Sequence, residues 1–272
     1  MATIRKLMTV LSPLDVRDYK IAAAADLPET FELPMPPVKN QKSTNSCVAH
    51  ACSTLVEYFN KLQESNTNSF STEFIYGYRP AGYYVGEGMY LRNALNTLRK
   101  RGDCRLEKLP GNNEYAQAMA NVEANIDELL EVAFPNRIST YFRLNSIEEI
   151  KTALYKYGPV VVSLPWGAHT TLNKDKELEN SSGEVSGYHC VVLYGWNEKG
   201  WLMQNSWGVS WGKKGHCIVP FDFTIAEAWG VTDEIIGEDE VSRPSTNWFI
   251  KVFYKIINVF YRAFFSKDFR TQ

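Results

Sequence analysis

QKSTNSCVAHACSTLVEYF, residues 41–59, is the stretch of the sequence that decides the fold. After Cys47 the apolar residues recur at helical spacing, and Asn45 or Ser46 can cap the start of the helix. The stretch therefore predicts a buried helix with Cys47 in its first turn. The positive end of a helix macrodipole favours a thiolate at that position. A lone buried cysteine is nevertheless more often a small apolar core residue, so Cys47 needs partners elsewhere in the chain to be a nucleophile.

Two later stretches supply the partners that a thiol nucleophile needs, namely a base and a group that orients the base. GYHCVVLYGW, residues 187–196, places His189 at the entrance of an apolar strand. WLMQNSWG, residues 201–208, places Asn205 directly after a second strand. Asn205 alone would be read as a turn residue. It becomes a candidate only because Cys47 and His189 stand in the other two stretches.

The three stretches, in this order, resemble the active-site segments of the papain family of cysteine peptidases. The resemblance implies that Cys47 is the nucleophile, that His189 is the general base and that Asn205 orients the imidazole. It also implies that the side-chain amide of Gln41 faces the oxyanion. No cofactor and no metal belong to this chemistry, and no Cys/His spacing in the sequence indicates a zinc site.

The resemblance extends to four residues that would contact a peptide substrate. Trp207 would shield the hydrogen bond between the base and its orienting residue and would flank the leaving group. Gly88 and Met89 would form a wall that pairs with the substrate backbone. Tyr188 is a further candidate for the lining of a pocket.

The order of the elements predicts an α+β protein of two lobes, with a papain-like fold. We expect a helical N-terminal lobe that contains the cysteine helix and an antiparallel, β-barrel-like C-terminal lobe. Further helices are expected at residues 89–101, 114–132 and 147–157, and strands at 160–164, 189–194, 201–204 and 216–219.

Shifts in composition predict four parts of the chain. These are a lead-in segment at 1–37, a peptidase domain at 38–236, an acidic, proline-containing linker at 237–247 and an amphipathic helix at 248–272. The sequence WFIKVFYKIINVFYRAFF, residues 248–265, leaves only a narrow polar stripe on that helix. Its apolar face could dock on a protein partner, lie on a membrane surface or pack on its own domain, and these alternatives stay open.

The composition excludes some classes of partner. Lys and Arg number 29 against 31 Asp and Glu, so the chain lacks the basic excess of nucleic-acid-binding proteins. The N-terminus lacks the long apolar core of a signal peptide, and the five cysteines have no framework spacing. We therefore expect a reducing, cytoplasmic location, with association to a phage or another assembly as an alternative.

The leading hypothesis is a peptidase that acts on peptide or protein substrates through a thioester. A peptide ligase or acyl transferase would use the same residues, with an amine in place of water. A catalytically silent module, docked through its C-terminal helix, is the alternative from another class. His50 competes formally as the base, but it lies one turn along the same predicted helix as Cys47.

Overall fold

The structure is a computed structural model, and it describes residues 9–16, 18–24, 26–64, 68–79, 86–180 and 183–233. The elements described below belong to the compact unit Met1–Ile236. The predicted linker at 237–247 and the predicted helix at 248–272 lie outside the described residues. Within the described part of the chain, no helix is long and apolar enough to cross a membrane.

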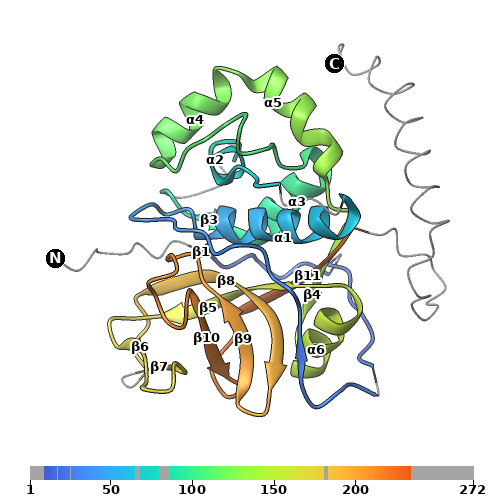
Figure 1. Cartoon of the computed structure of the whole chain (residues 1–272), viewed down its shortest axis with the longest axis vertical. Coiled ribbons are helices and arrows are strands. Elements are labelled where there is room, and N and C mark those ends of the chain that lie inside the picture. Colours follow the sequence, from blue (N-terminus) through green and yellow to red (C-terminus); the bar gives the residue numbers. More distant parts are fainter. Residues whose placement is uncertain are drawn as a thin grey trace. The chain divides into compact units, whose positions relative to one another are not determined.

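The N-terminal lobe is built around helix α1, which begins at Cys47 and ends at Glu64. Its apolar residues from Cys47 to Phe59 are buried, as the helical spacing predicts, whereas Leu62 in the last turn is exposed. The other helices lie on one side of α1, and the sheet lies on the other (Figure 1). These helices are α2 (Thr72–Gly77), α3 (Leu91–Arg101), α4 (Tyr115–Glu123) and α5 (Ile126–Ala133).

Two of the predicted helices differ from the prediction. The helix expected at 114–132 is divided, because Asn125 leaves the helical conformation with φ −135° and ψ 26° between α4 and α5. Asparagine is a weak helix former, although the Asn125 side chain makes no capping hydrogen bond here. The helix expected from residue 89 begins two residues later, since Met89–Tyr90 forms the short strand β3.

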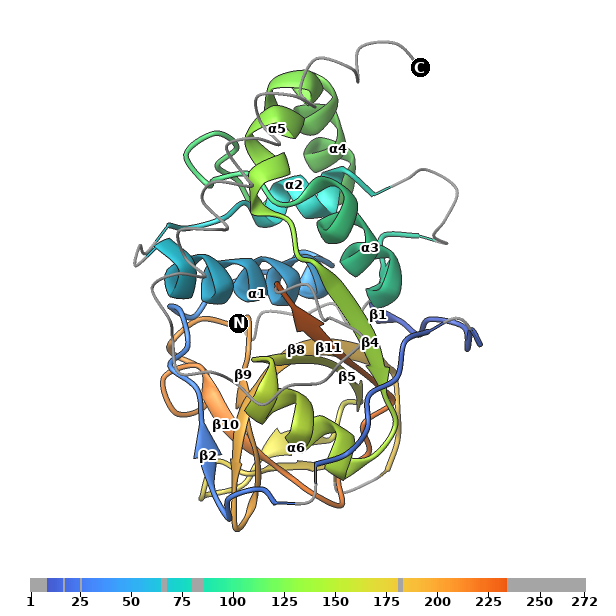
Figure 2. The same ribbon diagram turned by 90° about the vertical axis from the view of Figure 1, so that its right-hand side faces the viewer.

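The C-terminal lobe is an antiparallel sheet with the strand order β10-β9-β8-β5-β11-β4. Its strands are β4 (Thr140–Leu144), β5 (Val160–Trp166), β8 (Gly187–Asn197), β9 (Gly200–Gln204), β10 (His216–Pro220) and β11 (Glu227–Thr232). Helix α6 (Ile147–Lys156) packs on β8, as Figure 2 shows from the side. A small hairpin joins β6 (Thr170–Leu172) and β7 (Leu178–Asn180). The predicted two-lobed α+β architecture is confirmed.

Two short strands of the lead-in segment pack on this framework. Strand β2 (Phe31–Glu32) pairs with β8, and a Cβ added to Gly195 would lie 2.1 Å from the Phe31 carbonyl oxygen. Glycine in β8 therefore permits the close approach of the two backbones. Strand β1 (Thr9–Val10) pairs in parallel with β3 and brings the N-terminal segment to the start of α1.

Candidate active site

Cys47 is the first residue of α1, and it is fully buried. The N-terminal segment contacts its thiol, since Thr9 Oγ1 lies 3.2 Å from Cys47 Sγ. Helix α1 packs on β8, the strand that carries His189, so the predicted nucleophile and base lie on the two elements where the lobes meet. Because Cys47 is fully buried, part of its surroundings must move before a reagent reaches the sulfur.

The geometry of Asn205 sets the tautomer of His189. Asn205 Oδ1 lies 2.8 Å from His189 Nε2 and also accepts the backbone N–H of Ser206 at 2.7 Å. An atom that accepts from a backbone N–H must be the amide oxygen, so His189 donates from Nε2. This tautomer leaves Nδ1 as the ring nitrogen that can take a proton from a thiol.

The indole of Trp207 stacks on the imidazole of His189, with ring centroids 4.5 Å apart and an interplanar angle of 21°. Trp166 meets the same imidazole edge to face at 5.3 Å. Both indoles are almost fully buried, so they keep water from the hydrogen bond between His189 and Asn205.

Gln41 is held by the segment that follows β9. Its backbone N–H donates to the Ser206 carbonyl at 2.8 Å, and its Oε1 accepts from Ser206 Oγ at 2.6 Å. Its Nε2 donates one hydrogen bond to the Thr44 carbonyl at 3.0 Å. A primary amide has two N–H groups, so one donor remains for an oxyanion. Ser206 has no signal in the sequence other than its position next to Asn205.

The predicted substrate-binding residues separate into two groups. Met89 pairs with Thr9 across β3 and β1, and Gly88 directly precedes it, so the predicted wall already holds a strand of the chain itself. The Gly88 carbonyl accepts a hydrogen bond from the guanidinium of Arg79. Tyr188 is next to His189 in β8, and adjacent side chains of a strand point to opposite faces of a sheet. A pocket role for Tyr188 therefore stays a prediction without a supporting contact.

A polar cluster, which the sequence did not reveal, fixes the N-terminal segment beyond β1. Ser12 donates its backbone N–H to the buried Glu227 carboxylate at 3.0 Å, and its Oγ accepts the Arg92 backbone N–H at 3.1 Å. The Asp18 carboxylate pairs with the Arg92 guanidinium at 2.5 Å and with that of Arg143 at 3.9 Å. We call these five residues the latch.

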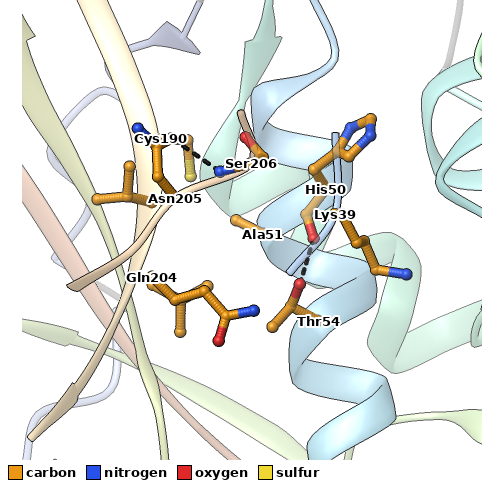
Figure 3. Close-up of a pocket in the computed structure, with 10 residues that line it drawn as sticks. Lys39, His50, Ala51, Thr54, Cys190, Gln204, Asn205 and Ser206 are labelled. Atoms are coloured by element: carbon orange, nitrogen blue, oxygen red, sulfur yellow. Dashed lines mark hydrogen bonds between the residues drawn. The ribbon is translucent and has the colours of Figure 1, made fainter. Parts of the chain in front are cut away.

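His50 does not compete as the base. Its Nδ1 lies 3.0 Å from the Ser46 carbonyl oxygen, and burial lowers the pKa of His50 to about 3. Together with Asn205 and Gln204 it lines a cavity of about 10 Å³ between α1 and β9 (Figure 3). A cavity of that size holds at most a single water molecule, so it is no substrate pocket.

The remaining cysteines are structural. Cys52, Cys104, Cys190 and Cys217 are buried, and burial raises the pKa of each thiol above its ordinary value. None of these four therefore forms a thiolate near neutral pH. Among the described residues, no group of three or more His, Cys, Asp or Glu side chains is arranged to hold a metal ion.

Comparisons with known proteins show which family the chain resembles. A family model, the papain family cysteine protease, matches residues 23–227. Cathepsin B-like cysteine proteinase 2 of Haemonchus contortus is 34% identical over 80 residues, which are 28% of this chain and 23% of that protein. Mexicain of Jacaratia mexicana is 26% identical over 196 residues, which are 66% of this chain and 80% of mexicain.

Among solved structures, xylellain, a cysteine protease from Xylella fastidiosa, superposes with a TM-score of 0.74 at 19% identity. The superposition covers 84% of this chain and 96% of xylellain. At this identity the likeness shows the fold alone. The chain spans about a quarter of the length of the cathepsin B-like relatives that it matches.

Proposed function

The chain belongs to the papain family of cysteine proteases, and from that membership we propose that it hydrolyses peptide bonds through a thioester on Cys47. The observation that carries the proposal is the arrangement around Asn205. Its oxygen is held by a backbone N–H and orients His189, so the imidazole presents Nδ1 as a base. An assembly module has no chemical need for this arrangement.

In the proposed reaction His189 Nδ1 takes the proton of Cys47, and the thiolate attacks the carbonyl carbon of the scissile peptide bond. The Gln41 amide and the Cys47 backbone N–H donate to the oxyanion that forms. The carbon–nitrogen bond then breaks, His189 gives its proton to the leaving amine, and a thioester remains. A water molecule, deprotonated by His189, hydrolyses the thioester and restores the thiol.

The position of the N-terminal segment supports a closed resting state. Thr9 lies against Cys47, and its strand pairs with the wall where a substrate backbone is expected. Substrate and segment therefore compete for the same surface. We propose that the chain binds substrate only after the segment from Thr9 to Ser12 has moved away.

Covalent labelling with an epoxysuccinyl thiol-protease inhibitor, read by intact mass and peptide mapping, tests the proposed function. We expect a single adduct on Cys47, and no adduct in Cys47→Ala or His189→Ala. Labelling that does not require His189, or that spreads over the buried cysteines, would contradict an activated nucleophile. Release of dye from a panel of peptide anilides, compared with Cys47→Ala, would then show whether the labelled protein is a hydrolase.

Two further proposals concern the surroundings of the enzyme. We propose that the segment 248–265 docks on a protein partner, because its predicted apolar face is too wide to leave in water. A chain truncated after Glu240 should lose partner binding but not peptidase activity, and loss of vesicle binding instead would favour a membrane surface.

A cytoplasmic location, supported by the five free thiols, would be tested by cell fractionation.

A further inference from the structure

Gln41 stands in a tight turn, residues 40–44, that we call the oxyanion turn. The turn is closed by Thr44, whose backbone N–H and Oγ1 both donate to the Gln41 carbonyl, at 3.1 and 2.7 Å. Lys42 adopts a positive φ of 53° within it, a conformation that is costly for a residue with a side chain. A turn that contains such a residue needs support from its surroundings to hold one geometry.

That support comes from the loop that precedes α4. Asn112 Nδ2 donates to the Asn40 carbonyl at 2.8 Å, and Asn112 Oδ1 lies 3.3 Å from Thr44 Oγ1, whose hydrogen is directed to the Gln41 carbonyl. One side chain therefore contacts the first and the last residue of the oxyanion turn, and its hydrogen bond to Asn40 holds the start of the turn. Asn112 makes no contact with the predicted nucleophile or base, so its effect on the reaction must pass through Gln41.

The loop that contains Asn112 is held in place by a buried carboxylate on α2. Glu73 is 1% exposed, and its two oxygens accept the backbone N–H of Asn113 at 2.9 Å and the side-chain amides of Asn113 and Asn121 at 2.5–2.9 Å. Gly111 approaches so closely that an added Cβ would lie 2.2 Å from Glu73 Oε2. The carboxylate thus fixes the residues on both sides of Asn112.

We propose that Asn112 is a positioning residue for the oxyanion donor Gln41, and that Glu73 holds Asn112 in place. The inference rests on the proposed function, since it assigns a role within the same site. Loss of Asn112 frees the oxyanion turn and displaces the Gln41 amide. The transition state of acylation then loses stabilisation, while the formation of the Cys47 thiolate is untouched.

Two reactions of Cys47 separate these effects. Acylation by a peptide anilide passes through an oxyanion, whereas alkylation by iodoacetamide displaces iodide and forms no oxyanion. Both reactions require the same withdrawal of Thr9, so the ratio of their rates isolates the oxyanion step. The variants are Asn112→Ala and the isosteric Asn112→Asp, which keeps the shape of the side chain but turns an oxygen towards the Asn40 carbonyl. Glu73→Gln tests the anchor.

We expect Asn112→Ala and Asn112→Asp to lower kcat for the anilide about tenfold, the factor that one neutral hydrogen bond represents, with KM and the alkylation rate unchanged. Glu73→Gln should lower the ratio of the anilide rate to the alkylation rate. Gln41→Ala should lower it about 100-fold or more. Asn145→Ala is the matched control, because Asn145 is exposed in the other lobe.

The outcomes separate the inference from the proposed function. A ratio that falls in Gln41→Ala but not in the Asn112 variants would overturn the positioning role alone. Asn112 variants that lose both rates together would also overturn it, since the thiolate would then depend on Asn112. A wild-type protein that cleaves no anilide faster than Cys47→Ala does would overturn the proposed function, and the inference with it.

Discussion

The ion pair between Asp18 and Arg92 should control how fast Cys47 becomes accessible. Asp18 is 8% exposed and Arg92 17%, and their closest atoms are 2.5 Å apart. A hydrogen bond to a charged group contributes about 1.5–3 kcal/mol, and this pair is screened less than one on the surface. Asp18→Ala removes the pair and also leaves the mostly buried Arg92 guanidinium beside Arg143 without its carboxylate. Opening of the N-terminal segment should therefore become roughly 10- to 150-fold more favourable.

Alkylation of Cys47 by iodoacetamide measures this opening, because the fully buried thiol reacts only after Thr9 has moved. The pseudo-first-order rate, read by intact mass, should rise in Asp18→Ala by the factor calculated above. Asp26→Ala is the matched control, since Asp26 is an exposed carboxylate of the same segment. The other four cysteines, which are also buried, report on unfolding and should stay unmodified. Equal rates in Asp18→Ala, Asp26→Ala and the wild type would refute the assignment of the latch.

Three further predictions concern the buried residues Asn205, His50 and Asp103. Asn205→Ala removes the 2.8 Å contact with His189, and we expect peptidase kcat to fall about 10- to 100-fold, measured with the anilide that the wild type cleaves best. Burial lowers the pKa of His50 to about 3, so the unfolded chain binds a proton there between about pH 3 and 6.5 and the native chain does not. The free energy of unfolding should therefore fall by up to about 1.4 kcal/mol per pH unit of acidification in that window. In His50→Gln, the free energy measured by urea unfolding should depend less steeply on pH than in the wild type. Burial raises the pKa of Asp103, so its carboxyl opposes folding as pH rises above about 4. Asp103→Asn should stabilise the protein more at pH 7 than at pH 4, and equal urea midpoints for variant and wild type at pH 7 would contradict this sign.

Much of the fold could be predicted from local patterns. The helix that starts at Cys47, the strand that contains His189 and the antiparallel lobe all carry a period of apolar residues that sequence alone reveals. The break at Asn125 was missed because the apolar period continues across it, and a single polar residue is a weak signal against a continuous period. The strand at Met89 was missed because its pairing partner, Thr9, lies far away in the chain.

The catalytic assignments were predicted from three motifs, and the structure brings His189 and Asn205 into contact and holds Gln41 at Ser206. Neither the role of Ser206 nor that of Asn112 has a sequence signal, because asparagine and serine occur in any turn and act here only through their distance to Gln41. The wall at Gly88 and Met89 was predicted, but not that a strand of the chain would occupy it.

The sequence by itself determined which residues could carry the chemistry, because a nucleophile at a helix start and an imidazole in an apolar strand are encoded by neighbours along the chain. Only the tertiary structure decided how those residues are held and covered. Ser12 meets Glu227 and Asp18 meets Arg92 across long separations in the sequence, and such contacts arise from packing rather than from local pattern. The contact between Thr9 and Cys47 is therefore a property of the folded chain as a whole.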